Sequence, residues 1–123
     1  MAGTRETYSI KLQIMSGRNI AMGPGKADLL EAIQKTGSIA AAGRAMGMSY
    51  KRAWDLVEIM NVCFCGPLVE KSKGGAGKGG ATVTALGLTI IDQYRALQAK
   101  SDSAVEREMH SFFSLLKHDD KDK

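Results

Sequence analysis

The sequence has little of what catalysis or metal binding requires. It contains two cysteines and two histidines in 123 residues. Cys63 and Cys65 lack the spacing of a zinc knuckle and have no second pair, while His110 and His118 lie far along the chain. No Ser–His–Asp or Cys–His arrangement falls on one element. We therefore predict no enzymatic activity, no metal site and no cofactor. We interpret the thiols as free and buried; a disulfide between two copies, or a redox or metal switch, is the alternative.

Long apolar runs and a secretory signal are also missing. No hydrophobic stretch approaches the ~20 residues of a membrane span, and the N-terminus has no leader pattern. Hydrophobic residues make up 44% of the sequence, which is enough for a folded core. We expect one cytoplasmic domain over residues 1–123, with its core at 20–84, helices at 85–117 and a charged tail at 118–123.

The segment from Ser38 to Asn61, SIAAAGRAMGMSYKRAWDLVEIMN, predicts two short helices joined by a tight turn. Ser38 and Ser49 are placed to cap the two helices. Gly47 suits the turn because glycine adopts the left-handed conformation without steric cost. Apolar residues at helical spacing form the two inward faces: Ile39, Ala42 and Met46, then Ala53, Val57 and Met60.

The exposed start of the second predicted helix is typical of a DNA-reading surface. Ser49, Tyr50, Lys51 and Arg52 form its first turn, and Trp54 follows, which we expect to be partly buried. In helix-turn-helix proteins this turn meets base edges in the major groove. Taken alone, the segment also fits a helical hairpin of an unrelated core.

A glycine-rich segment with three lysines follows. Leu68–Glu70 and 81–84 predict two strands around the loop Lys71–Gly80, which together make a β-hairpin. A helix-turn-helix followed by such a hairpin is the winged form. Its glycine tip can lie close to the sugar–phosphate backbone, and its lysines neutralise phosphates: Lys71, Lys73 and Lys78. A nucleotide-binding loop is disfavoured, because Gly77-Lys78 is followed by Gly79 instead of serine or threonine. The net charge of +4 permits nucleic-acid binding.

The flanks complete a mainly α fold with a small antiparallel β-hairpin, a winged helix-turn-helix with an N-terminal strand and long C-terminal helices. Alternating apolar residues predict the strand at Tyr8–Met15, and a turn-like stretch leads to a helix from about Lys26 to Thr36. After the hairpin, Thr84 can cap a long helix with Ile90, Ile91, Tyr94 and Leu97 as its apolar positions.

The last predicted helix is strongly apolar on one side. Ser103 and Glu106 match a capping box at its start. Its apolar residues are Val105, Met109, Phe112, Phe113, Leu115 and Leu116. This surface either packs on the chain's own core or, as we favour, forms a two-fold homodimer interface. A dimer would suit a palindromic operator, whose half-sites lie about one helical turn apart.

Several short strings carry a family resemblance: Gly37-Ser38-Ile39, Ser49-Tyr50-Lys51 with Ala53-Trp54-Asp55, Met60-Asn61, Leu68-Val69-Glu70, and Gly77-Lys78-Gly79-Gly80-Ala81 with Thr84 and Gly87. From about Tyr8 to the early part of the last helix, the chain resembles the N-terminal DNA-binding domain of molybdate-dependent transcriptional regulators (the ModE family). The resemblance implies a dimeric winged helix that controls genes for molybdate uptake and molybdoenzymes.

Full-length family members continue into a C-terminal molybdate-binding domain that this chain lacks, so molybdate binding is not expected here. Met1 and the charged tail favour a naturally short relative over a truncated one.

The prediction is therefore a sequence-specific DNA-binding transcriptional regulator. Its predicted DNA contacts are Ser38, Ser49, Tyr50, Lys51, Arg52, Trp54, Lys71, Lys73, Gly77, Lys78 and Gly79. The alternative is an oxyanion- or metal-responsive binding protein that uses the glycine–lysine loop or the two cysteines.

Overall fold

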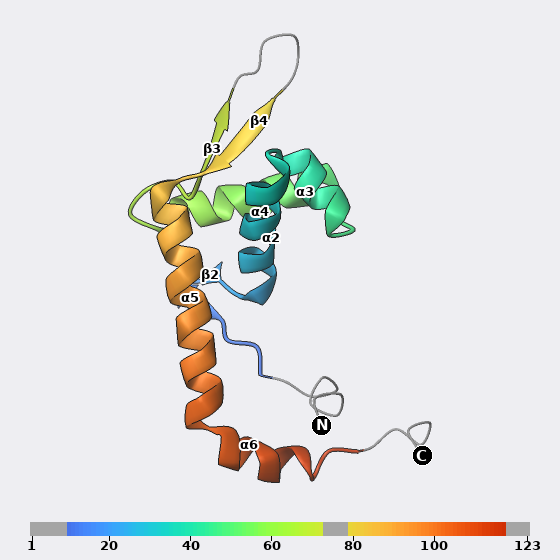
Figure 1. Cartoon of the computed structure of the whole chain (residues 1–123), viewed down its shortest axis with the longest axis vertical. Helices are drawn as coiled ribbons and strands as arrows, with labels where there is room; N and C mark the ends of the chain where they lie inside the picture. The colour runs from blue at the N-terminus through green and yellow to red at the C-terminus, as the bar shows by residue number, and fades with distance from the viewer. Residues whose placement is uncertain (1–9, 73–78, 118–123) are drawn as a thin grey trace. The chain divides into compact units, whose positions relative to one another are not determined.

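In the computed structural model, which describes residues 10–72 and 79–117, the chain is mainly helical with two small antiparallel hairpins (Figure 1). The elements are β1 (Ile14–Ser16), β2 (Asn19–Met22), α2 (Pro24–Thr36), α3 (Ile39–Ala45), α4 (Tyr50–Cys63), β3 (Val69–Ser72), β4 (Gly80–Val83), α5 (Ala85–Ala104) and α6 (Glu106–Phe113). Residues 11–95 form one compact unit, and residue 10 with residues 96–117 belongs to a second. Within the described ranges, no helix is both long and apolar enough to cross a membrane.

A proline at the start and a glycine at the end set the limits of helix α2. Pro24 occupies its first turn, where the missing N–H has no intrahelical partner to lose. Gly37 ends it with φ 80°, and its N–H donates to the Ile33 carbonyl at 2.8 Å. The predicted helix from Lys26 to Thr36 is confirmed, with a start two residues earlier.

The two helices predicted from Ser38 to Asn61 are confirmed as α3 and α4. The Ser38 Oγ accepts the Ala41 N–H at 2.9 Å, and the Ser49 Oγ accepts the Arg52 N–H at 3.1 Å. Gly47, with φ 71°, lies in the turn between them. The helices approach closely at Gly43, where a Cβ would lie 3.2 Å from the Ala53 Cβ. Helix α4 is longer than predicted, since Cys63 belongs to the helix and not to the following loop.

The N-terminal strand prediction is partly wrong. No strand covers residues 10–13, and Tyr8 lies outside the described residues. Instead β1 pairs with β2 through a stretch that we predicted as a turn, with Ser16 opposite Asn19. Gly17, with φ 61°, begins the two-residue loop and supplies the positive φ that such tight hairpins require. The β1–β2 pairing was not recognised in the sequence because the strands are short and the loop between them is polar.

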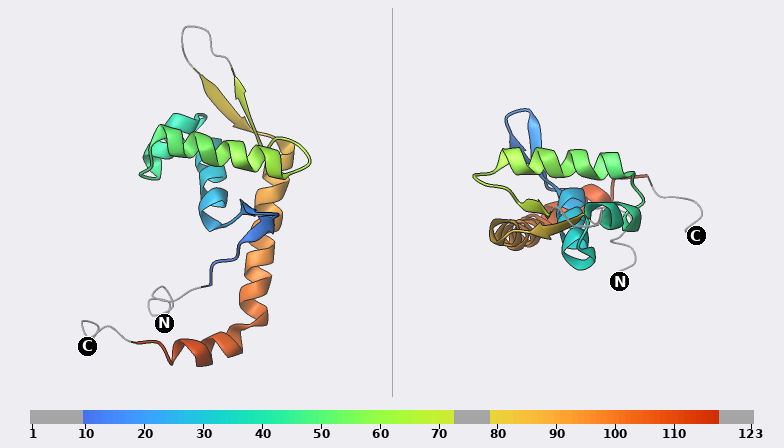
Figure 2. Two further views of the ribbon diagram at one scale, coloured as in Figure 1. Left: turned by 180° about the vertical axis from the view of Figure 1, so that it is seen from behind. Right: turned by 90° about the horizontal axis from the view of Figure 1, so that it is seen from above.

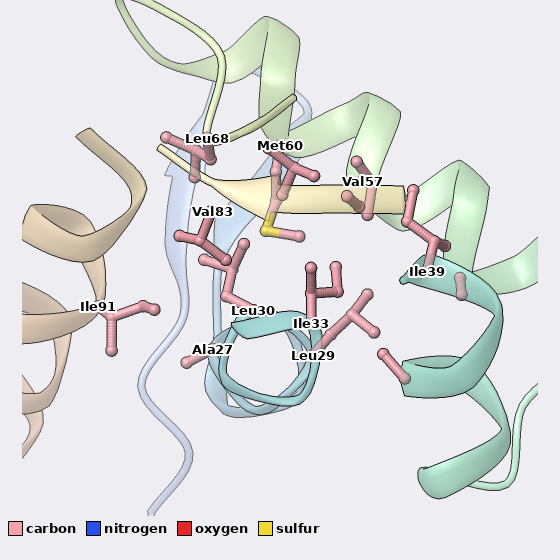
Figure 3. Close-up of a cluster of buried hydrophobic side chains, with 14 of the residues drawn as sticks. Ala27, Leu29, Leu30, Ile33, Ile39, Val57, Met60, Leu68, Val83 and Ile91 are labelled. Atoms are coloured by element: carbon pink, nitrogen blue, oxygen red, sulfur yellow. The ribbon is translucent and has the colours of Figure 1, made fainter. Parts of the chain in front are cut away.

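The core of the 11–95 unit lies where α2, α3, α4, the β3–β4 hairpin and α5 meet (Figure 3). Figure 3 shows Leu30 and Ile33 from α2 together with Val57 and Met60 from α4. Leu29, Leu30 and Ile33 are fully buried, as are Ala53, Val57 and Met60. The inward positions predicted for α4 are therefore confirmed; of those predicted for α3, Ile39 and Ala42 are buried and Met46 is partly buried.

Two residues of helix α5 make long-range polar contacts with the rest of the same unit. The Tyr94 hydroxyl donates to the Leu12 carbonyl at 2.7 Å. The Arg95 guanidinium donates to Asp28 at 2.7 Å and to Glu31 at 3.0 Å, and these hydrogen bonds raise the pKa of Arg95 above its ordinary value. Thr84 caps the helix as predicted, because its Oγ1 accepts the Gly87 N–H at 3.0 Å.

Beyond Arg95, two details of the C-terminal helices differ from the prediction. Ser103 lies inside α5 and does not cap α6; Val105 precedes α6, with no side-chain hydrogen bond at the cap. Leu97, one of the apolar positions of the long helix, is exposed. Helix α6 ends at Phe113, so Leu115 and Leu116, which we predicted on this helix, lie beyond it. None of the α6 side chains is buried, and the exposed fractions of Phe112 on α6 and of Leu115 beyond it are 61% and 81%.

Candidate nucleic-acid interface

The first turn of α4 presents polar and basic side chains to solvent. Tyr50 is 54% exposed, and the Lys51 and Arg52 residues are also exposed. Lys51 forms an ion pair with Asp55 one helical turn later, with 3.1 Å between Nζ and Oδ2. This pair is solvated, so its energy is small and a competing phosphate or base can replace it. Ser49 and Ser38 use their hydroxyls as helix caps, which leaves their remaining lone pairs and O–H groups available.

The predicted wing is present as β3 and β4, which run antiparallel from Val69 opposite Val83 to Ser72 opposite Gly80. The left view of Figure 2 shows that this hairpin projects from the helical part of its unit. β3 is one residue longer than predicted and includes Lys71, which we predicted in the loop, while β4 has the predicted length but begins one residue earlier. The predicted contacts Lys73, Gly77 and Lys78 lie outside the described residues, while Gly79 is exposed just before β4.

Hydrogen bonds at the start of the β3–β4 hairpin join the wing to the helices. The Asn61 side chain accepts the Leu68 and Val69 N–H groups at 2.8 and 3.2 Å and donates to the Val69 carbonyl at 3.1 Å. On the other strand, the Ala81 N–H donates to the Gly37 carbonyl at 2.8 Å. The wing is thus fixed to the end of α4 and to the turn between α2 and α3.

Lys71 also joins the wing to α4 through its side chain. Its ammonium pairs with the Glu58 carboxylate and lies 3.8 Å from the centre of the Trp54 ring. Trp54 is partly buried, as predicted, and its ring lies 6.0 Å from that of Tyr50. Lys71 therefore already has an acidic partner, which the prediction of a phosphate ligand did not include.

A groove of about 360 Å³ lies between the wing and the starts of α3 and α4. Both helices and both strands line it: Ser38, Ile39, Ala40, Tyr50, Trp54, Lys71, Ser72, Gly79 and Gly80. It brings together five of the predicted DNA contacts, whereas Ser49, Lys51 and Arg52 are not in its lining. Sequence reasoning missed Glu58 and Ser72. Glu58 follows Trp54 by four residues and so shares its helix face, but only the folded wing brings Lys71 to that face.

The two cysteines differ from their predicted environment. Both thiols are free, but Cys63 is half-buried and Cys65 is exposed. Residues 10–72 and 79–117 contain no group of three or more His, Cys, Asp or Glu side chains placed to hold a metal ion.

Burial lowers the pKa of Lys26 below its ordinary value; the positive charge of Arg52 acts in the same direction, and Cys63 opposes it.

By their names, proteins similar to this chain include transcriptional regulators, a molybdenum transport protein and molybdenum-pterin-binding proteins, and the regulators among them support transcriptional regulation as the class of function. The molybdenum transport protein ModE of Azotobacter vinelandii is 36% identical over 107 residues, 87% of this chain and 39% of that protein. ModE of Escherichia coli K12, named a DNA-binding transcriptional dual regulator, is 36% identical over 97 residues, 79% of this chain and 34% of that protein. The molybdenum-pterin-binding protein MopB of Rhodobacter capsulatus is 46% identical over 78 residues, 63% of this chain and 29% of that protein.

The chain thus spans between 29% and 39% of the length of these three relatives. No family model matches it. Among solved structures, a LysR family transcriptional regulator has the same fold over 84% of this chain and 32% of its own, with a TM-score of 0.54 and 16% identity. That likeness concerns the fold alone.

Proposed function

We propose that this chain is a winged helix-turn-helix domain of the ModE type that binds double-stranded DNA in a sequence-specific way and regulates transcription. The exposed first turn of α4 beside a glycine- and lysine-rich hairpin is the observation that carries the proposal. Tyr50, Lys51 and Arg52 enter the major groove and contact base edges, because the N-terminal turn of the second helix is the part that reaches them. The wing contacts the sugar–phosphate backbone and adds affinity without sequence information.

Two further features belong to the same proposal. The exposed apolar residues of α6 join two copies into a homodimer that matches a palindromic operator. The regulated genes are those of molybdate transport or molybdoenzymes, as the resemblance to the ModE family implies. The chain acts in the cytoplasm, and molybdate does not bind to it directly.

A second candidate is an oxyanion- or metal-responsive binding protein. It is favoured by one observation, the 46% identity to MopB, a protein named for binding molybdenum-pterin. That identity extends over 29% of MopB, and the name describes the whole protein. In this reading the glycine–lysine loop or the two cysteines would hold the ligand.

DNA binding measured with and without molybdate separates the two candidates. A labelled duplex from a molybdate-transport promoter and a duplex of scrambled sequence are titrated over a range of salt concentrations. The first candidate predicts tighter binding to the promoter, a steep salt dependence and no effect of molybdate. Equal affinity for both duplexes would reduce the proposal to a general DNA binder, and binding of molybdate without DNA binding would favour the second candidate.

The Lys78→Ala variant tests the assigned role of the wing in the same titration. The loss of one phosphate contact should lower affinity for both duplexes alike and reduce the log–log salt slope by about one. The exposed Lys100 on α5, changed to alanine, is the control for net charge. A Lys78→Ala variant that loses affinity for the promoter duplex alone would contradict a backbone role for the wing.

A further inference from the structure

The groove between the wing and the starts of α3 and α4 has a single charged residue among its described lining residues, Lys71. Its other polar groups are hydroxyls, on Ser38, Tyr50 and Ser72, and backbone at Gly79 and Gly80. Ile39, Ala40 and Trp54 supply apolar surface. One cation with neighbouring hydroxyl donors matches a phosphodiester, and the apolar surface beside them matches a deoxyribose.

The ammonium of Lys71 lies where this groove meets the face of α4. It pairs with Glu58, which does not line the groove, and it lies over the Trp54 ring, which does. Trp54 and Glu58 are one helical turn apart on α4, so the same helix face holds both partners. An ammonium has three N–H donors, and contact with the ring face uses none of them fully. A phosphate in the groove can therefore reach the same ammonium that Glu58 holds.

The Lys71–Glu58 pair is too solvated to withstand a competitor. The side chains are 33% and 45% exposed, and ion pairs with this exposure contribute little to stability. A DNA phosphate that approaches Lys71 also meets the negative charge of Glu58. Glu58 weakens phosphate binding in two ways, because it occupies the Lys71 ammonium and because its negative charge repels the phosphate. Glu58 also favours binding in one way, since it orients the long Lys71 side chain. This effect is smaller than the other two, because the Trp54 ring orients the same side chain.

We propose that this groove binds one backbone phosphodiester of DNA at Lys71, and that Glu58 competes with that phosphate and so limits the affinity of the protein for DNA of any sequence. The proposal rests on the DNA-binding function proposed above. It assigns to Glu58 a role opposite to that of the basic residues around it. Lys71 exchanges one anionic partner for another when DNA binds, and its contact with Trp54 makes the exchange observable.

A double-mutant cycle on Glu58 and Lys71 tests the proposal with a duplex of random sequence. Glu58→Gln removes the competing charge at nearly constant shape and should raise affinity by about threefold, with a steeper salt dependence. Lys71→Met keeps the aliphatic stem over Trp54 and removes the ammonium. In that background Glu58→Gln should have a much smaller effect, because there is no cation left to release.

Glu70→Gln is the matched control, because it makes the same change in net charge on the residue next to Lys71. Adjacent side chains of a strand point to opposite faces, so the effect of Glu70→Gln should be the same with and without Lys71→Met. Thermal unfolding of each variant shows that it is folded. The emission of Trp54, the only tryptophan in the chain, reports the exchange directly and should change when DNA binds to the wild type.

Four outcomes are distinguishable. If Glu58→Gln binds more tightly and the gain requires Lys71, the proposal holds. If Glu58→Gln binds no more tightly or more weakly, Glu58 does not compete and the proposal is wrong. If the gain is equally large in the Lys71→Met background, the effect is general electrostatics and the proposal is also wrong. If the wild type binds no DNA at low salt, the proposed function itself fails.

Discussion

Among single residues, Asn61 has the largest defined role in fixing the wing. Its amide satisfies two N–H groups and one carbonyl at the start of β3. Glu58 and Lys71 join the same two elements, but through a solvated pair. The attachment of the wing therefore depends more on one neutral amide than on the charges beside it.

Replacement of Asn61 by alanine should consequently destabilise the fold. The change leaves the Leu68 and Val69 N–H groups without their partly buried acceptor, at a cost of about 2–3 kcal/mol in the free energy of unfolding. Urea unfolding followed by circular dichroism measures this cost. Asn61→Asp keeps an acceptor oxygen and loses the donor, so it should be destabilised less than Asn61→Ala. An equal loss of unfolding free energy in both variants would mean that Asn61 does not stabilise the fold mainly by accepting the Leu68 and Val69 N–H groups.

The base preference is expected to depend on Lys51 and Arg52. Alanine at either position should cost about 1–3 kcal/mol on the preferred sequence and much less on random DNA, because the lost contact is to a base. Parallel titrations of preferred and random duplexes give this difference. Lys35→Ala, an exposed lysine at the end of α2, is the control for charge. Equal losses on both duplexes would reassign Lys51 or Arg52 to the backbone.

At the scale of elements, the packing of α5 against the base of the wing depends on Gly87. A Cβ at this position would lie 2.5 Å from the Leu68 carbonyl oxygen and 2.6 Å from Val83 Cγ1. Val83 belongs to β4, and Leu68 lies just before β3. Because the Leu68 contact is with a backbone atom, the clash could be relieved only if α5 or the hairpin shifted. The helix and the hairpin can lie in contact only because this residue has no side chain.

Gly87→Ala should therefore lower the melting temperature, even though alanine is the better helix former by about 1 kcal/mol. The steric cost of overpacking, about 1–3 kcal/mol, exceeds that gain. Gly66→Ala is the matched control, because its Cβ would meet only Leu86 Cδ2 at an ordinary 3.5 Å. Thermal unfolding by circular dichroism compares the two. A Gly87→Ala variant as stable as the wild type would mean that α5 does not pack on the wing this closely.

The elements that the sequence predicted correctly are those defined by local chemistry. Ser38 and Ser49 cap helices through residues three positions away, and Gly37 and Gly47 end helices through their own φ angles. The β1–β2 hairpin was missed because its strands are short and lack a clear alternation. The Glu58–Lys71 pair was missed because its partners are thirteen residues apart and meet only in the folded chain.

For the whole molecule, the association of two copies is the main prediction. Phe112 and Leu115 expose much of their apolar surface, and burial in a two-fold interface would remove it from water. Serine at both positions should convert the dimer to a monomer in sedimentation experiments and weaken binding to a two-half-site duplex more than to a single half-site. Ser111→Ala, a change at an exposed position of α6 next to Phe112, should remain a dimer. A wild-type chain that sediments as a monomer would contradict this assignment.

The central claim, that the first turn of α4 reads a DNA sequence, is tested most directly by selection from a pool of random duplexes. The wild-type chain should enrich one motif made of two inverted half-sites about one helical turn apart. The variant with alanine at both Lys51 and Arg52 should lose the preference at defined positions of that motif while it still binds DNA. A wild-type selection that enriches no motif, or a double variant that enriches the same motif, would contradict the account.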